Sequence, residues 1–412
     1  MTAPFLNMEG VAFAIAGGLS GLGGSRRTPR LVAEDDALTV RELSLEQLDA
    51  AQAAWCDLSA RALEPNAFYE PGFALSAARH FPLNSRPRFI VVSDGARITG
   101  LFPIVPSHPL VGDGFIRLWL TKQATLATPL VDRDRATDTI AAFLDWVEAR
   151  SLAAGVVFAR TPAKGAFHAA LAEVARRDAR RVETLESFER AALLPGGEAD
   201  ETCARASGSK RQLANIQRMR RRLAEKGAVE FQIVDSPEEV RLATEEFLTL
   251  EAAGWKAGRG AFLSEPALAT FLRAATRQLA RDRRCKISAL RLDGRPVAMA
   301  ILIDSQNRSY YWKIAYDESL RSCAPGLQLI YEQTKAQLAR PGVEITDSCA
   351  MPDHPVIGRM WPDRVRVCDV AVQLQTNGEA QFQWSCRRDG ARRHIRELAK
   401  RTANRLLKRK VS

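Results

Sequence analysis

The pattern of apolar and polar positions divides the chain into two similar series of elements. Alternating apolar runs flank Asp94-Gly95 in the first half and Asp293-Gly294 in the second, a pattern typical of a β-hairpin. In each half a further strand, a helix and a short strand follow the hairpin. The elements predicted in the first half after residue 87 are 88–105, 115–120, 135–152, 155–159, 163–177 and 181–185. An internal repeat of this kind indicates two copies of one supersecondary unit.

The most informative stretch of the second half runs from Arg308 to Arg340. Its aromatic, β-prone residues from Tyr310 to Tyr316 predict a strand, and the chain then turns through Asp317 to Gly326. A helix is predicted next, with one face formed at spacings of three and four by Leu327, Ile330, Tyr331, Thr334 and Leu338. Pro325-Gly326 stands at its start, where the first amide N–H groups lack intrahelical partners and the helix dipole is positive. The sequence therefore predicts an anion site at this helix end.

Length and charge distribution limit the classes of function. A chain of 412 residues is too long for one typical core and suggests two domains. The net charge of +11 is local, because residues 205–230 carry eight basic and two acidic side chains and residues 387–412 carry eleven and two. These segments sum to +15, so the rest of the chain is about −4. A nucleic-acid binder that uses its whole surface is disfavoured.

The seven cysteines and five histidines show no metal-binding pattern. The cysteines are dispersed without a C-x-x-C pair, which fits a reducing cytoplasm and offers no zinc spacing. The histidines form no H-E-x-x-H motif, so we expect no metal. Cys349 has His354 near it in sequence, but no positioned base is indicated and thiol catalysis is not expected. We expect the protein to be cytoplasmic.

Residues 1–36 are expected to form a disordered leader. The stretch from Val11 to Gly24 is apolar and rich in glycine. A signal peptide would carry basic residues before this stretch, whereas Glu9 precedes it and Arg26-Arg27 follow. The stretch is also too short and too rich in glycine to span a membrane.

The turn before the helix of the second half resembles the pyrophosphate-binding turn of GNAT-superfamily acyltransferases. Their usual pattern is Gln/Arg-x-x-Gly-x-Gly/Ala, and Arg321-Ser-Cys-Ala324-Pro325-Gly326 keeps its first and last positions. Ala324 replaces the middle glycine, and an ordinary βα connection is the alternative interpretation. The first half has no glycine from Thr121 to Thr137, so we expect only the second unit to bind the cofactor.

A second motif lies between two predicted helices of the second half. Leu250 to Gly260 resembles the Glu-x-x-Gly-Trp-Lys segment of the GNAT-like CelD type, which is associated with cellulose biosynthesis. Asn66 to Phe73 resembles a segment of Fem-type transferases, which also have two tandem GNAT-like units. Trp255 can instead be a core or lid residue. The resemblance covers roughly residues 205–375 and is loose before them.

The resemblance implies an α/β (α+β) fold of two tandem GNAT-like units, each a mixed, largely antiparallel sheet flanked by helices. The expected parts after the leader are an N-terminal unit at 37–204, a basic bridging helix at 205–230, an acyl-CoA-binding unit at 231–380 and a basic amphipathic helix at 381–412. The bridging helix is either a solvated linker or faces an anionic acceptor or the ribose phosphate of CoA. The C-terminal helix is either a solvated or RNA-binding tail or a peripheral contact with an anionic membrane surface.

The resemblance also implies roles for individual residues. Acetyl-CoA is the expected co-substrate, and its expected binding residues are Trp312, Ile314, Arg321, Gly326, Leu327 and Gln328. Those expected to bind the acceptor substrate are Trp255, Lys256, Tyr316 and Asp317. The expected general base is Glu251, Asp347 or His354. Tyr331 is expected to act as the acid that protonates the leaving thiolate.

The implied function is transfer of an acyl group, with acetyl expected, from acyl-CoA to an amine or hydroxyl in envelope or exopolysaccharide biosynthesis. One alternative is a Fem-like aminoacyltransferase that uses charged tRNA, in which the basic segments bind the tRNA. The other is a non-catalytic scaffold of an envelope polysaccharide system. The main interpretation includes no specific nucleic acid, and no motif identifies the acceptor.

Overall fold

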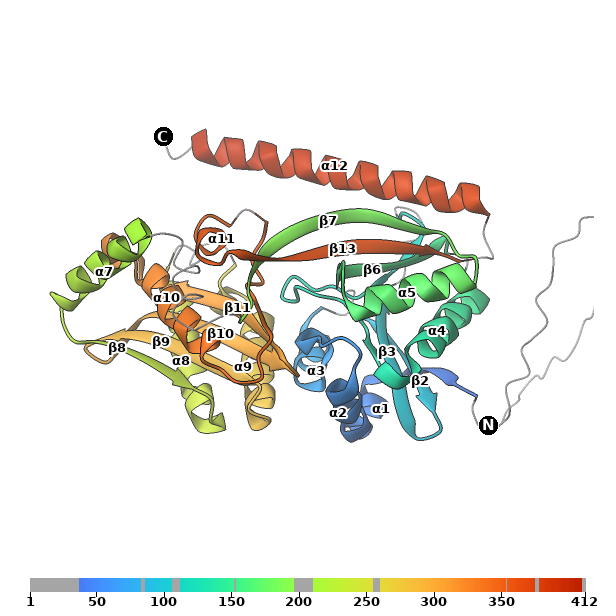
Figure 1. The fold of residues 1–412 in the computed structure, drawn as a ribbon, viewed down its shortest axis with the longest axis horizontal. Coiled ribbons are helices and arrows are strands. Elements are labelled where there is room, and N and C mark those ends of the chain that lie inside the picture. Colours follow the sequence, from blue (N-terminus) through green and yellow to red (C-terminus); the bar gives the residue numbers. More distant parts are fainter. Residues whose placement is uncertain are drawn as a thin grey trace, which may run out of the picture. The chain divides into compact units, whose positions relative to one another are not determined.

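The computed structural model describes residues 37–82, 86–105, 112–151, 153–195, 210–254, 260–352, 354–374 and 378–409. The predicted leader lies outside these residues. The chain from Leu38 onward packs as one compact unit with a mixed α/β architecture, in which helices flank one large, mostly antiparallel sheet (Figure 1). This architecture confirms the predicted fold class.

The first half of the chain alternates strands and helices up to a long final strand. The elements are β1 (Thr39–Leu43), α1 (Leu45–Ala50), α2 (Gln52–Arg61), η1 (Ala67–Tyr69), α3 (Pro71–His80), β2 (Arg88–Asp94), β3 (Arg97–Val105), β4 (Phe115–Leu118), β5 (Leu130–Val131), η3 (Arg133–Arg135), α4 (Ala136–Arg150), β6 (Gly155–Pro162), α5 (Ala166–Arg177) and β7 (Val182–Leu193). The hairpin predicted around Asp94-Gly95 is β2–β3. The strand predicted at 181–185 is much longer in the structure, because β7 pairs along its length with a strand from the end of the chain.

The second half repeats the hairpin, strand, helix and strand order. Its elements are α7 (Lys210–Ala224), β8 (Val229–Val234), α8 (Pro237–Ala253), η4 (Phe262–Ser264), α9 (Pro266–Arg281), β9 (Cys285–Leu292), β10 (Arg295–Ser305), β11 (Arg308–Tyr316), η5 (Glu318–Cys323), α10 (Pro325–Leu338), β12 (Ile345–Asp347), α11 (Ile357–Met360), β13 (Asp363–Gln373) and α12 (Glu379–Arg409). Strands β8 and β13 were not predicted, although both segments alternate apolar and polar residues.

The two halves share one 13-stranded sheet in the described part of the chain. The strand order is β1-β2-β3-β4-β6-β13-β7-β12-β11-β10-β9-β8, and β5 pairs with β3. Strand β13 comes from the second half but lies between β6 and β7 of the first, whereas the end of β7 pairs with β12 of the second. The halves are therefore interleaved in the sheet. The domain boundaries expected at residues 204 and 231 stay a prediction.

Two pairs of neighbouring strands are parallel, one in each half. Strands β4 and β6 pair over Phe115–Arg117, and β11 and β12 pair over Arg308–Tyr310. Strand β11 continues to Tyr316 beyond the last residue that it pairs with β12. Its edge from residue 311 to 316 thus has no strand partner on that side within the described sheet.

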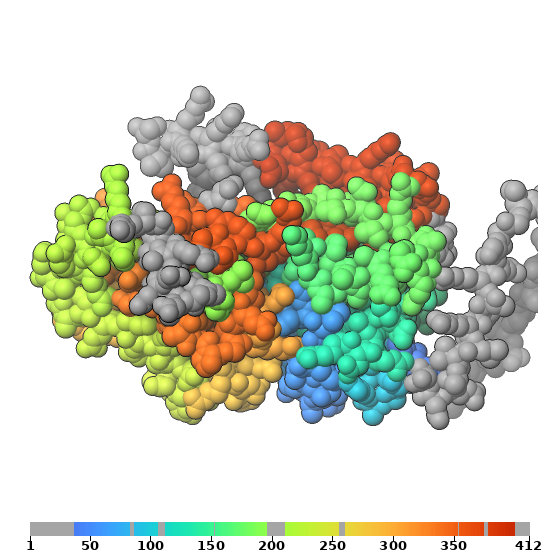
Figure 2. Space-filling model, viewed as in Figure 1, coloured from blue at the N-terminus to red at the C-terminus, as the bar shows by residue number. Residues whose placement is uncertain are grey.

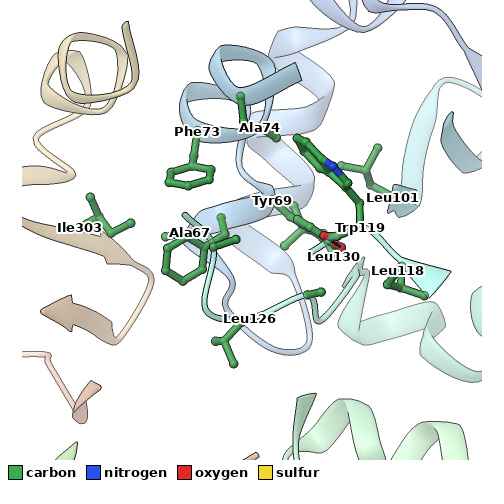
Figure 3. Packing of buried hydrophobic residues seen from close by; sticks show 14 of the residues in the cluster. Ala67, Tyr69, Phe73, Ala74, Leu101, Leu118, Trp119, Leu126, Leu130 and Ile303 are labelled. Atoms are coloured by element: carbon green, nitrogen blue, oxygen red, sulfur yellow. Dashed lines mark hydrogen bonds between the residues drawn. The ribbon is translucent and has the colours of Figure 1, made fainter. Parts of the chain in front are cut away.

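A shared hydrophobic core joins the first-half helices to the second half. Phe73 of α3 contacts Phe271 of α9 and Trp312 of β11 edge to face, with ring centroids 5.2 and 5.4 Å apart. Figure 3 shows Tyr69 and Phe73 packed between Trp119 of the first half and Ile303 of the second. This packing fixes α3 and the segment after β4 beside β11.

Candidate active site

The turn between β11 and α10 has a left-handed residue directly before the start of the helix. Ala324 is left-handed, with φ 46° and ψ 57°, and Pro325 is the first residue of α10. A left-handed residue favours glycine, which explains why a glycine is usual here and why alanine is strained. The Leu327 and Gln328 amides donate to the Ala324 carbonyl at 3.1 and 3.2 Å. Among the described residues, the Gly326 amide has no hydrogen-bond acceptor, although Gly326 itself is buried at the start of the helix.

Tyr316 lies directly against this turn. A Cβ atom added to Gly326 would lie 3.1 Å from Cδ1 of Tyr316, so the glycine allows the ring to approach the helix start. Asp317 has a structural role, because its Oδ1 accepts hydrogen bonds from the Ser319 amide at 2.9 Å and hydroxyl at 2.6 Å. Burial opposes ionisation, but these bonds and one from Arg295 lower the pKa of Asp317. The structure thus brings Tyr316 to the predicted anion site and uses Asp317 as the cap of η5.

A cavity of about 750 Å³ lies beside the first turn of α10 and is called here the arginine hollow. Three arginines line it: Arg211 and Arg218 from α7 and Arg359 from α11. Its other lining residues are Gln212, Ala214, Asn215, Leu327, Pro355 and Val356. No carboxylate is among these residues. Arg218 donates to the Asn215 side chain at 2.7 Å, and within the described chain neither Arg211 nor Arg359 forms an ion pair. Such a surface favours an anion with several negative oxygens.

A buried ion pair lies where the pairing of β11 with β12 ends. Asp347 pairs with Tyr310 in the last parallel register position, and its Oδ2 accepts a hydrogen bond from Arg190 of β7 at 2.5 Å. Arg190 is 2% exposed, and it also donates to the Thr125 carbonyl at 3.0 Å. Burial alone would lower the pKa of Arg190, but the Asp347 charge raises it. The first half therefore supplies a cation to the second half's strand junction.

Cys349 lies next to this ion pair with a strained backbone, at φ 54°. Its amide donates to Asp347 Oδ1 at 2.9 Å, and the Thr125 hydroxyl donates to its Sγ at 3.3 Å. Burial and the Asp347 charge raise the pKa of the thiol to about 12. A thiol with this pKa is a poor nucleophile at neutral pH.

The other predicted catalytic residues are separated in the structure. Glu251 is 3% exposed, and its Oε2 accepts from the Phe262 amide at 2.9 Å, which closes the loop after α8. His354 is exposed, and its Nδ1 accepts from the Val356 and Ile357 amides at 3.4 Å each, just before α11. Partial burial lowers the pKa of His354. Tyr331 is half-buried on α10, with the Lys335 ammonium 5.0 Å from its ring centroid.

Strand β11, the strand predicted to bind the cofactor, is hydrogen-bonded to Gln123 of the first half through two side chains. Trp312 is 6% exposed, and its indole N–H donates to the Gln123 carbonyl at 2.7 Å. Lys313 donates to the Gln123 side chain at 2.6 Å. Ile314 packs against the second-half core, and Arg321 is exposed at the end of η5. Trp255 and Lys256 lie outside the described residues. Residues 37–409, as far as they are described, contain no cluster of three potential metal ligands.

Comparison with known families gives a match within the second half. Residues 210–350, about a third of the chain, match the family described as the acetyltransferase (GNAT) domain. No curated protein matches the sequence.

Solved structures show that the fold extends beyond the GNAT domain. FemX is 11% identical with a TM-score of 0.51, and the match covers 82% of this chain and 97% of that one. The C-terminal domain of a proposed lysylphosphatidylglycerol synthetase from Agrobacterium fabrum is 14% identical with a TM-score of 0.50, covering 81% and 94% of the two chains. A conserved protein from Bacteroides thetaiotaomicron VPI-5482 has 11% identity, a TM-score of 0.50 and coverage of 82% and 100%. At these identities the similarity is one of fold, and the narrower CelD resemblance stays a prediction.

Two features of the candidate site could not be predicted from the sequence. The basic pattern of α7 indicated a contact with anions, but nothing connected Arg359 with α7, because these residues are about 140 positions apart. Arg190 was also missed, because it stands in an alternating charged stretch that suggests an exposed strand. Only the pairing of β7 with β12 reveals that it is buried.

Proposed function

We propose that this chain transfers an acyl group, acetyl in the first instance, from acyl-CoA to an amine or hydroxyl. The arginine hollow beside the start of α10 is the observation that carries the proposal. Its lining has three arginines and no carboxylate, and the positive end of a 14-residue helix, with the Gly326 amide that lacks an acceptor, lies beside it. CoA carries a pyrophosphate and a ribose phosphate, so its charges match a site of this composition.

The free edge of β11 completes the proposed donor site. Backbone groups from residue 311 to 316 would pair with the amides of the pantetheine arm, and the start of α10 would hold the pyrophosphate. Arg211, Arg218 and Arg359 would hold the ribose phosphate, with Tyr316 at the turn between these parts. The protein then contributes chiefly positioning of the thioester against the acceptor.

The candidates for the general base differ in the hydrogen bonds that they accept. A neutral His354 that accepts hydrogen bonds at Nδ1 carries its proton on Nε2, so this arrangement favours capping over catalysis. Asp347 is engaged by Arg190 and by the Cys349 amide. Glu251 is held by the Phe262 amide at one oxygen. We retain Glu251 and Asp347 as candidate bases and Tyr331 as the candidate acid.

Calorimetric titration with acetyl-CoA and with 3′-dephospho-acetyl-CoA tests this proposal. We expect Arg211→Ala/Arg359→Ala to weaken acetyl-CoA binding by about tenfold or more, because two charge-assisted contacts are lost. The same variant should bind the dephospho compound about as well as the wild type does. Arg221→Ala/Arg222→Ala is the matched control, since it removes two exposed arginines of the same helix outside the hollow. Equal weakening by both variants would contradict a phosphate site in the hollow.

The second candidate function is aminoacyl transfer from charged tRNA. The exposed arginines of α7, including Arg221 and Arg222, favour it, because such a surface also suits a phosphate backbone. The fold shared with FemX is compatible with this function. Salt-sensitive tRNA binding without acetyl-CoA binding would select this candidate.

Helix α12 supports a further proposal on location. Trp384, Ile395 and Leu398 are 54%, 65% and 48% exposed on a basic helix, a composition suited to an anionic membrane surface. None of the described helices is both long and apolar enough to cross a membrane. Ile395→Glu/Leu398→Glu should reduce sedimentation with vesicles of one-third phosphatidylglycerol and two-thirds phosphatidylcholine. Cytoplasmic location and a role in envelope polysaccharide synthesis stay predictions.

A further inference from the structure

A second cavity, of about 780 Å³, lies in the first half between the β4–β6 junction and α12 and is called here the α12 pocket. Its walls come from the end of β4 with the segment after it, from β6, from the start of α9 and from α12. A volume of this size suits a small molecule. Most of the wall lies outside the matched GNAT domain. In Figure 2, α12, in red, lies over the green residues of the first half.

Helix α12 is held in place over this pocket by apolar and ionic contacts. Phe382 is 1% exposed and meets Phe115 of β4 edge to face, with ring centroids 5.8 Å apart. Arg393 bonds Asp369 of β13 at 2.8 Å and Asp389 at 2.5 Å, and it also pairs with Glu186 of β7. These contacts make the helix a fixed wall rather than a tail.

The carboxylates of the pocket are already paired with arginines, with one exception. Arg393 forms ion pairs with Glu186, Asp369 and Asp389. Arg117 donates a hydrogen bond to Asp113 at 2.6 Å. Arg392 lies 3.5 Å from Asp113. Within the described lining, Glu265 is the carboxylate without an ion pair. The native ion pairs therefore neutralise most of the negative charge of the walls.

Three cations of the pocket have no carboxylate partner within the described chain. Lys122, Arg160 and Arg396 form no ion pair within the described chain, although all three line the cavity. The Arg160 guanidinium lies 4.9 Å from the Phe188 ring centroid, and its backbone is strained at φ 50°. Its amide bonds Asp369 at 2.8 Å, which fixes this strained residue at the pocket wall. The lining as a whole has six cations and five carboxylates, and this excess of one positive charge favours an anionic ligand.

Gln123 connects the α12 pocket with the proposed donor strand. It lines the pocket, its carbonyl accepts from Trp312 at 2.7 Å, and its side chain accepts from Lys313 at 2.6 Å. We propose that the α12 pocket binds the acyl acceptor, a small molecule that carries a phosphate or carboxylate beside its amine or hydroxyl. Lys122, Arg160 and Arg396 bind the anionic group, and the nucleophile points past Gln123 toward β11. This assignment of the acceptor rests on the proposed acyl transfer, whereas the anion site itself does not.

Fluorine NMR of protein labelled with 5-fluorotryptophan tests the anion site in the absence of CoA. Trp119 lines the pocket, and its signal is assigned among the seven tryptophans with Trp119→Phe. Titration with inorganic phosphate should shift this signal saturably. Lys122→Ala/Arg396→Ala should weaken the apparent affinity for phosphate by about tenfold. Arg211→Ala/Arg359→Ala, which changes the arginine hollow by the same charge, should leave the Trp119 titration unchanged.

Two results would overturn the proposal. The first is that the Trp119 signal shows no saturable shift up to about 50 mM phosphate or acetate, about the upper limit for a weak site. The second is that Lys122→Ala/Arg396→Ala has the same apparent affinity for phosphate as the wild type. A parallel titration with acetate decides between phosphate and carboxylate as the preferred anion. Acetyl-CoA binding by Lys122→Ala/Arg396→Ala is measured on the same sample and should equal that of the wild type. If acetyl-CoA does not bind but phosphate shifts Trp119, the donor proposal fails and the anion site stands.

Discussion

The parallel pairs β4–β6 and β11–β12 are built alike, but the chain continues from them differently. Each pair is joined over three residues. After β11 the chain turns through left-handed Ala324 into α10, so a helix N-terminus points to the strand junction. After β4 it runs through Trp119 and Gln123 to the short strand β5, and α12 covers the junction instead. The same order of elements is thus accompanied by the arginine hollow in one copy and, in the other, by the α12 pocket, whose cations outnumber its carboxylates by one.

The two junctions are also linked, because β7 of the first half brings Arg190 to the second junction. Asp347→Ala would leave the Arg190 charge buried without its partner. We expect this to lower the free energy of unfolding by about 3–5 kcal/mol, the largest effect predicted here. Urea denaturation measures it.

The control is Arg190→Met/Asp347→Leu, which removes both charges and should regain most of the lost stability. A loss under 1 kcal/mol in Asp347→Ala, within the range of exposed ion pairs, would show that the link between the halves is weak. The two halves would then be stabilised independently of each other.

The strands that precede the two junctions differ in charge. The pH dependence of protein stability should reveal this difference. Strand β3 ends on Ile104 and Val105, whereas Asp304 near the end of β10 bonds Lys286 and Arg340 at 2.7 Å each. Burial opposes ionisation of Asp304, but hydrogen bonds and charges of these partners lower its pKa. Its folded-state pKa lies below the unfolded value of about 3.9. Its stabilising contribution is therefore complete above that value and is lost as the pH falls through the folded-state pKa.

We therefore expect Asp304→Asn to be less stable than the wild type at pH 7, with a difference that narrows below about pH 4. Thermal unfolding from pH 7 to pH 3 measures the two curves. A difference that stays constant over this range would show that the charge of Asp304 contributes nothing.

The smallest predicted effect concerns the turn that distinguishes the second junction. Ala324→Gly relieves a left-handed alanine, which costs roughly 1–2 kcal/mol, but increases the entropy of the unfolded chain by roughly 0.4–1 kcal/mol. We expect a net stabilisation of up to about 1 kcal/mol, with acetyl-CoA binding retained. Destabilisation measured in urea would contradict the left-handed conformation.

Local patterns predicted the elements that are stabilised by near neighbours in sequence. The hairpins around Asp94-Gly95 and Asp293-Gly294 and the helix after Pro325 were predicted, because turn chemistry and periodicity specify them. Strand β13 was missed although its residues alternate, and its place in the sheet could not be predicted because its partners in β6 are about 200 residues away. The arginine hollow and the α12 pocket were missed for the same reason, as each assembles side chains from distant segments.

The central claim is that the start of α10 holds the phosphates of acyl-CoA. Calorimetric titration of acetyl-CoA into the wild type, Gly326→Asp and Gly326→Asn tests it most directly. Asp and Asn have the same shape and press equally on Tyr316, so their difference isolates the negative charge. We predict that the wild type binds one acetyl-CoA and that Gly326→Asp binds it at least about tenfold more weakly than Gly326→Asn, a difference of about 1.4 kcal/mol. Equal affinities for the two variants, or no binding by the wild type, would contradict the claim.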